Sequence, residues 1–190
     1  AMGTHPNDES ATLTELGPDQ LRVLNTLVIV ENLPMFAIFR QVLEGLGIRN
    51  VVHGRNARAS VETLMTEPID LVIIDDLMPV DGVKFLTLLR KGSQKLPHAV
   101  PVMFVTARAE RERILAARDA GASEIMLKPF TALQLRARLE TTVQKPREFV
   151  ESSAYVGPDR RRRSDDGAAL ERRSTERGDR RHLVNPLVLD

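Results

Sequence analysis

The sequence contains no cysteine and no long apolar run. The absence of cysteine excludes disulfide bonds, thiolate metal sites and cysteine nucleophiles. No apolar run approaches the roughly 18 residues of a membrane span, and the first residues lack the charged-then-apolar pattern of a secretory signal. We therefore expect a cytoplasmic protein without membrane insertion. Any metal would be bound by oxygen ligands or by the few histidines.

The chain also has almost no net charge, with a formal value of +1 over 190 residues, but its residue types are segregated along the sequence. Residues 1–25 form a polar N-terminal extension with one weak apolar periodicity. Residues 26–145 hold nearly all the aliphatic clusters and are predicted to be one folded domain. Residues 146–190 form a polar, irregular C-terminal extension that is dominated by arginine from Gly157 onward.

Within the folded domain, short β-branched runs alternate with stretches of helical period. This alternation predicts an α/β domain with a parallel sheet and helices on both faces. Each predicted strand is continuously apolar, which is typical of strands buried on both faces. The five predicted strands are Leu27–Val30, Val51–His53, Leu71–Ile74, Val102–Val105 and Ile125–Leu127.

Polar side chains follow four of these strands. The first strand runs into Glu31-Asn32, the third into Asp75, the fourth into Thr106 and the fifth into Lys128. Because the carboxyl ends of strands in a doubly wound sheet meet at one edge, we expect these side chains to surround one crevice. Clustered carboxylates of this kind favour Mg²⁺, which keeps several waters and takes only a few carboxylates. Lys128 and Thr106 would then bind an anionic group delivered to Asp75.

Taken together, the motifs of residues 26–144 resemble the receiver domain of two-component response regulators. The resemblance is carried by the acidic turn at Glu31, by Asp75 with Met-Pro and Asp-Gly behind it, by Thr106-Ala107 and by Lys128-Pro129-Phe130. It implies a doubly wound, flavodoxin-like fold with five parallel strands in the order 2-1-3-4-5. It also implies a cis peptide bond between Lys128 and Pro129.

The same resemblance implies roles for individual residues. Asp75 would be the phosphoacceptor, Glu31, Asp75 and the Leu77 carbonyl would bind Mg²⁺, and Thr106 and Lys128 would bind the phosphoryl oxygens. The implied partners are a histidine kinase or phosphotransfer protein and a downstream protein target. Such a protein is not itself an enzyme. We expect a stand-alone receiver that acts by protein contact, with its readout on the fourth and fifth strand-helix units.

Several residues depart from the receiver pattern. Receivers usually carry two adjacent acids after the first strand, whereas this chain has Glu31-Asn32, so one carboxylate is missing. The loop from Met78 to Gly82 is one residue shorter than usual, and Ile125 stands where many receivers place an aromatic switch residue. In the alternative interpretations, Glu31 caps the following helix, Asn32 is a turn residue, and Asp76 lies outside the site.

The C-terminal extension is the second informative feature, because no receiver needs it to fold. Arginine, whose planar fork reads guanine edges and stacks on bases, outnumbers lysine there. Interspersed carboxylates would weaken binding to a generic polyanion and would suit the N1 and N2 protons of guanine. The predicted ligand-binding residues are Arg160, Arg161, Arg162, Arg163, Arg172, Arg173, Arg177, Arg180, Arg181, Asp166 and Asp179.

This combination suits a small guanine dinucleotide such as cyclic di-GMP. It also resembles the arginine-rich extension of a subgroup of chemotaxis-like receivers that bind cyclic di-GMP and act on the flagellar motor. Two alternatives are a solvated, charge-mixed tail and a phosphorylation-independent adaptor that folds around the nucleotide. A nucleic-acid-binding regulator is a further alternative, which the lack of a recognisable helix-turn-helix after residue 144 argues against.

Overall fold

The computed structural model describes residues 22–76, 81–144, 147–152 and 154–160. Residues 1–159 belong to one compact unit, and residues 160–190 form a second unit of which only Arg160 is described. The weak apolar periodicity of the N-terminal extension lies outside the described residues. Leu77 and all the predicted ligand-binding residues of the tail except Arg160 also lie outside them.

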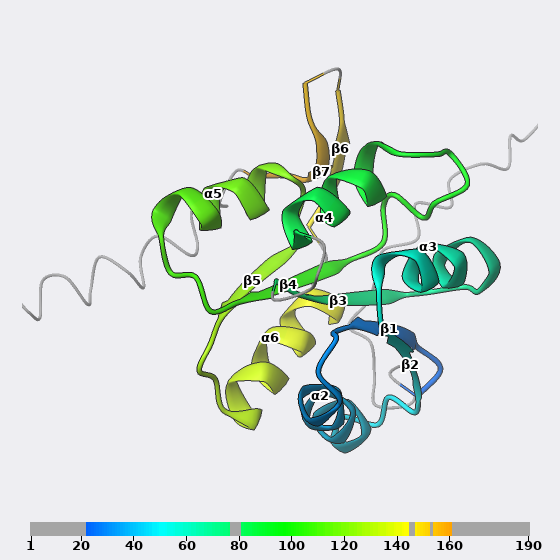
Figure 1. Cartoon of the computed structure of the whole chain (residues 1–190), viewed down its shortest axis with the longest axis vertical. Helices are drawn as coiled ribbons and strands as arrows, with labels where there is room; N and C mark the ends of the chain where they lie inside the picture. Colours follow the sequence, from blue (N-terminus) through cyan, green and yellow to red (C-terminus); the bar gives the residue numbers. More distant parts are fainter. Residues whose placement is uncertain (1–21, 77–80, 145–146, 153, 161–190) are drawn as a thin grey trace, which may run out of the picture. The chain divides into compact units, whose positions relative to one another are not determined.

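The core of the first unit is a five-stranded parallel sheet with the order β2-β1-β3-β4-β5, which confirms the predicted fold class (Figure 1). The strands end within two residues of their predicted bounds. They are β1 (Asn25–Ile29), β2 (Asn50–Gly54), β3 (Leu71–Asp75), β4 (Val102–Thr106) and β5 (Glu124–Leu127). The helices between and after them are α2 (Leu33–Gly45), α3 (Ala57–Thr66), α4 (Gly82–Lys91), α5 (Arg111–Asp119) and α6 (Ala132–Gln144).

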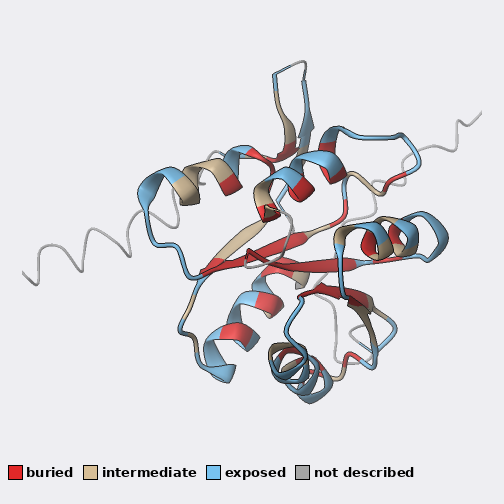
Figure 2. Ribbon diagram, viewed as in Figure 1, coloured by how far each residue is buried: buried red, intermediate tan, exposed pale blue. Residues whose placement is uncertain are grey.

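The sheet separates two hydrophobic cores. Alternate residues of a strand point to opposite faces, so Leu27 and Ile29 pack with α3, α4 and α5, whereas Val28 packs with α2 and α6. The central strands β3 and β4 are buried along their whole length (Figure 2). Burial on both faces explains why these strands are uninterrupted aliphatic runs in the sequence.

Helix caps set the positions where the chain turns back from the sheet edge. The side chain of Asn32 accepts a hydrogen bond from the Met35 amide at 3.1 Å, so Asn32 caps α2 and the alternative in which Glu31 caps it is wrong. The carboxylate of Asp81 caps α4 by accepting from the amides of Val83 and Lys84, at 2.9 and 3.2 Å. Both caps lie at the edge where the strands end.

A C-terminal hairpin, β6 (Phe149–Glu151) and β7 (Val156–Pro158), follows α6. We expected this segment to be irregular, but its two strands pair antiparallel and β7 contacts α4 (Figure 1). The Phe149 ring lies 5.5 Å from the guanidinium carbon of the buried Arg90. The hairpin is therefore part of the first compact unit. Among the described residues, no helix combines the length and the apolar character that a membrane span needs.

Candidate functional site

Asp75 and Lys128 meet at the edge of the sheet where the strands end. Asp75 is the last residue of β3, and Lys128 follows β5 at the start of a cis peptide bond to Pro129, as the resemblance predicted. The Lys128 Nζ lies 2.6 Å from Asp75 Oδ2. The side chains are only 14% and 5% exposed, so this is a largely desolvated ion pair. The ammonium compensates the charge of a carboxylate that would otherwise be costly to bury.

A pocket of about 360 Å³ opens at this ion pair. Residues from the end of β1 and from the first turn of α2 form its other wall. The lining residues are Val30, Glu31, Asn32, Met35, Asp75 and Lys128. Glu31, Asp75 and Lys128 therefore border one space, although they come from three different strand ends.

The oxygen ligands at this pocket fit a hard cation that keeps most of its water. Glu31 and Asp75 supply two carboxylates, and Mg²⁺ is usually bound through one or two. The Asn32 side-chain oxygen is already used in capping α2. Within the described part of the chain, no group of three or more acidic, histidine or cysteine side chains could hold a metal by itself. Glu31 and Asp75 would thus hold Mg²⁺ together with waters.

Thr106 lies at the same sheet edge but contacts a different carboxylate. It ends β4, is fully buried, and its hydroxyl donates to Asp76 Oδ2 at 2.8 Å. The Thr106 hydroxyl oxygen in turn accepts a hydrogen bond from the Arg108 amide at 3.0 Å. Asp76 is buried directly after Asp75 and accepts the Thr106 hydroxyl, but it is not among the residues that line the pocket at Asp75 and Lys128.

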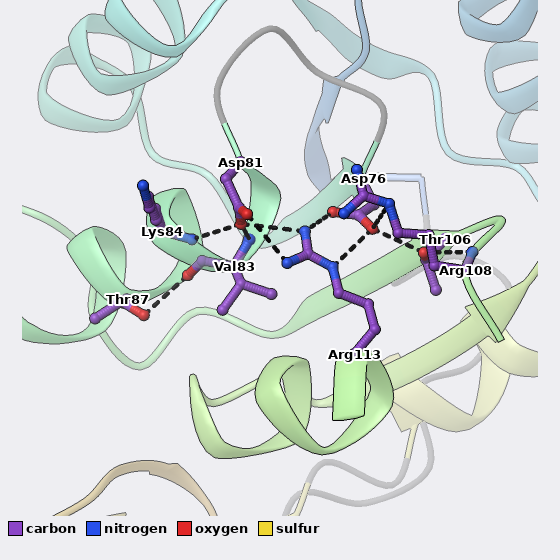
Figure 3. Close-up of polar contacts among 8 residues, drawn as sticks. All are labelled: Asp76, Asp81, Val83, Lys84, Thr87, Thr106, Arg108 and Arg113. Carbon is purple, nitrogen blue, oxygen red and sulfur yellow. Dashed lines mark hydrogen bonds and ion pairs between the residues drawn. The ribbon is translucent and has the colours of Figure 1, made fainter. Parts of the chain in front are cut away.

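Arg113 of α5 joins Asp76 to Asp81 (Figure 3). Its Nε donates to Asp76 Oδ2 at 2.9 Å and its NH2 donates to Asp76 Oδ1. Its NH1 and NH2 also donate to the two oxygens of Asp81, each at 3.1 Å. We call Asp76, Asp81 and Arg113 the Arg113 cluster. It connects the end of β3, the start of α4 and the first turn of α5.

The cluster is a set of charge-assisted hydrogen bonds, and its electrostatics follow from them. The hydrogen bonds from Arg113 hold the pKa of the Asp81 carboxyl below its usual range, against the opposing effect of burial. The hydrogen bonds to Asp76, and then to Asp81, raise the pKa of Arg113 above its ordinary value. Asp81 and Arg113 therefore remain charged across the physiological pH range.

The sequence did not predict the Arg113 cluster. One signal was present: Asp76 continues a buried strand, and a carboxylate at such a position needs a cationic partner. Nothing in the spacing of the arginines in the sequence selected Arg113 as that partner. Ile125 packs against the core as a partly buried aliphatic residue, so no aromatic side chain occupies that position.

The order of the strands and the pairing of Asp75 with Lys128 agree with one known family. The model of the response regulator receiver domain matches residues 27–140. The chain belongs to this family. The match ends before the hairpin β6–β7 and before the arginine-rich extension.

Curated relatives and solved structures agree with that assignment. The chain is 34% identical over 136 residues to the KDP operon transcriptional regulatory protein KdpE of Escherichia coli (strain K12), covering 71% of this chain and 55% of KdpE. It is 29% identical over 123 residues to the chemotaxis protein CheY-3 of Vibrio cholerae, covering 64% of this chain and 93% of CheY-3. A response regulator from Thermotoga maritima has a TM-score of 0.56 at 25% identity, covering 64% of this chain and 98% of that structure.

The extent of these matches differs between relatives. The chain spans about half the length of KdpE and of the transcriptional regulatory protein YvrH of Bacillus subtilis, at 55% and 52%. The chemotaxis response regulator CheY4 of Vibrio cholerae, at 20% identity and a TM-score of 0.56, shares the fold. What these relatives have in common with this chain is the receiver domain.

Proposed function

We propose that this chain is a phosphoacceptor response regulator, in which Asp75 takes a phosphoryl group from a histidine kinase or a phosphotransfer protein. The observation that supports this most directly is the desolvated pair of Asp75 and Lys128, 2.6 Å apart, at a pocket that Glu31 also lines. A receiver of this kind acts by protein contact in the cytoplasm and is not itself an enzyme. Its target would be a downstream protein.

The chemistry asks little of the protein beyond positioning and charge stabilisation. An Asp75 carboxylate oxygen bonds to phosphorus while the bond from phosphorus to the donor nitrogen or oxygen breaks, and the leaving group takes up a proton. Lys128 already contacts the carboxylate and would follow the added oxygens of the phosphoryl group. Mg²⁺, bound through Glu31 and Asp75, would neutralise charge on those oxygens. The Leu77 carbonyl stays a predicted ligand outside the described residues.

Labelling with a small phosphodonor such as acetyl phosphate tests this proposal. Full-length protein with Mg²⁺ should gain one phosphoryl group, measured by intact mass, and Asp75→Asn should gain none while unfolding at a similar temperature. Asp76→Asn is the matched control, because it changes the neighbouring carboxylate and should still be labelled. Undiminished incorporation in Asp75→Asn would remove the assignment, and labelling that does not need Mg²⁺ would remove the metal.

For the arginine-rich extension we propose binding of a guanine dinucleotide such as cyclic di-GMP. The downstream target of the bound form would be the flagellar motor. This proposal rests on the arginine and carboxylate pattern after Pro158. Titration of cyclic di-GMP and of unrelated DNA at two salt concentrations tests it. Saturable, guanine-specific binding supports it, whereas a steep salt dependence without base preference favours nucleic acid.

The hairpin decides where the chain should be cut for this comparison. β7 ends at Pro158, and the Asp159 amide donates to the Glu148 carbonyl at 2.7 Å. A chain that ends after Asp159 therefore keeps the hairpin, whereas one that ends at Val156 would remove most of β7. Cyclic di-GMP binding by the longer of these truncated chains would contradict the assignment to the extension.

A further inference from the structure

The hydroxyl of Thr106 can donate only one hydrogen bond, and in this structure it donates to Asp76. The bond is 2.8 Å long and both residues are buried. The lone pairs of the hydroxyl are the acceptors for the Arg108 amide. A phosphoryl group on Asp75 accepts hydrogen bonds and has none to donate. Thr106 therefore cannot contact that group as a donor without leaving Asp76.

We propose that Asp76 is a positioning residue that competes with the phosphorylated acceptor for the Thr106 hydroxyl, so that release of Thr106 from Asp76 is a step in activation. This rests on the proposed function, because it requires a phosphoryl group at Asp75. Asp76 is well suited to compete. It is the residue after the acceptor, and its backbone amide donates to the Val105 carbonyl at 2.8 Å, so the neighbouring strand fixes it beside Thr106.

Arg113 keeps the competing carboxylate in place. Its guanidinium contacts both oxygens of Asp76, and its own side chain is only 14% exposed. A charged, two-point contact of this kind fixes the direction of a carboxylate more strictly than a single bond does. The Asp76 Oδ2 atom thus accepts from Thr106 and from Arg113 at the same time.

Asp81 in turn fixes Arg113. The Asp81 carboxylate binds two nitrogens of the guanidinium and also caps α4 through the Val83 amide (Figure 3). The helix comes close to the strand end because its first residue is Gly82, where a Cβ atom would lie 2.9 Å from the Phe104 ring. The cluster is therefore tied to β3, α4 and α5, and Thr106 is tied to the cluster.

Competition has a measurable consequence. If Thr106 must be released before it can contact the phosphoryl group, the apparent affinity of the protein for that group is reduced by the fraction of molecules in which Thr106 is released. Weakening the Thr106–Asp76 bond should then raise the affinity. Since a hydrogen bond to a charged acceptor is among the stronger ones in proteins, we expect a gain on the order of tenfold.

The experiment is calorimetric titration of the full chain with beryllofluoride and Mg²⁺, a mimic of the phosphoryl group. The paired change Asp76→Leu with Arg113→Met removes the competing carboxylate and its cation together, so that no unpaired charge stays buried. Asp76→Asn is the near-isosteric second variant, with a smaller expected gain. Arg113→Met alone keeps the competing carboxylate but removes the cation that holds it in place, and should give a smaller gain than the paired change.

Thr106→Ala separates positioning from a general loosening of the site. The gain from the changes at Asp76 should disappear in the Thr106→Ala background, because the competition needs the hydroxyl. An equal gain in affinity in the Thr106 and Thr106→Ala backgrounds would overturn the proposal. So would the absence of any gain from the changes at Asp76, provided that the wild type binds the mimic. Thermal unfolding of each variant identifies any that fails to fold. If the paired change fails to fold, the affinity of Asp76→Asn is compared with that of the wild type instead.

The same titration distinguishes this inference from the proposed function. Binding by the wild type that is lost in Asp75→Asn supports the function whatever the variants at Asp76 do. Binding only after the changes at Asp76 supports both, because the competition would then be strong enough to mask the site. No binding by the wild type or by any Asp76 variant would overturn both.

Discussion

The guanidinium of Arg90 binds the carbonyl of Gly121 through Nε at 3.0 Å. Arg90 belongs to α4 and is only 3% exposed, while Gly121 lies in the turn between α5 and β5. The NH1 atom of the same side chain donates to the carbonyls of His98 and Val100, at 2.6 and 2.8 Å. Burial lowers the pKa of Arg90 to about 10, and it stays charged at neutral pH. One side chain thus binds three backbone carbonyls from two loops, next to Phe149 of the hairpin.

Arg90→Met should therefore destabilise the fold more than an ordinary surface change. The substitution keeps most of the apolar stem but leaves buried carbonyls without their donor, which costs about 1–3 kcal/mol per unsatisfied group, so we expect a loss of about 2–4 kcal/mol in the free energy of unfolding. Urea denaturation measures it. Arg118→Met, at an arginine with a side chain 48% exposed, is the control and should change stability little. Equal losses in the two variants would contradict a structural role for Arg90.

The Asp81 carboxylate should contribute to stability against acid. Its pKa is lowered below the ordinary 3.8 by Arg113, so at pH values between the folded and the unfolded pKa the unfolded state binds more protons than the folded state. The stabilisation is present above pH 4 and is lost as the pH falls through the folded pKa. The charged groups facing Asp81 are Arg113 and, through it, Asp76.

Asp81→Asn should accordingly flatten the loss of stability below pH 4, because the neutral amide can still cap α4 but no longer titrates. Denaturant unfolding at a series of pH values from 5 downward measures the slope. Glu62→Gln, at an exposed glutamate on α3, controls for the removal of one carboxylate. An acid limb identical to that of the wild type would show that the ion pair with Arg113 contributes nothing to folding.

Gly82→Ala should lower stability, although alanine is the better helix former. The added Cβ atom would lie 2.9 Å from the Phe104 ring and 3.3 Å from the Asp76 Cα, so the ring or the strand end must move. Overpacking of this kind costs about 1–3 kcal/mol. At Gly45 nothing lies within 4 Å of the added atom, and Gly45→Ala should be neutral or stabilising by about 0.5–1 kcal/mol. The two midpoints in urea should therefore move in opposite directions.

Lys128→Met should leave the Asp75 carboxylate buried without its cation. Breaking a fully buried pair costs about 3–5 kcal/mol, and since the Lys128 side chain is still 14% exposed we expect a smaller loss of about 1–3 kcal/mol. The combined variant Lys128→Met with Asp75→Asn should regain part of that loss, because the buried side chain at position 75 then carries no charge. A double-mutant cycle of unfolding free energies gives the coupling, and strict additivity would argue against a direct ion pair.

The sequence predicted the elements that depend on local pattern. Leu71–Ile74 and Val102–Val105 read as buried strands because a strand covered on both faces must be apolar throughout, and their ends brought Asp75 and Thr106 to one edge. The same geometry predicted that Lys128 lies at this edge with Asp75, whereas the direct ion pair between them is a finding of the structure. The partner of Thr106 was not predicted, because the choice between Asp75 and Asp76 depends on the direction of side chains at a strand end.

The hairpin was not predicted, for a different reason. Its strands have three residues each, and isolated hairpins of that size are marginal in water. The hairpin is held by contacts with distant residues. Phe149 packs over the guanidinium of Arg90, and a ring nitrogen of His98 lies 2.8 Å from Glu151. No local pattern reports contacts with residues so distant in sequence.

The hairpin also affects whatever follows it. The bond between the Asp159 amide and the Glu148 carbonyl closes the hairpin one residue before Arg160. A ligand or partner captured by the next residues is therefore tethered to a fixed point on the domain, and its effective concentration there depends on how few residues separate it from Asp159. Glycines and serines inserted directly after Arg160 would lower the effective concentration of the bound molecule at the domain without altering a contact within the receiver domain.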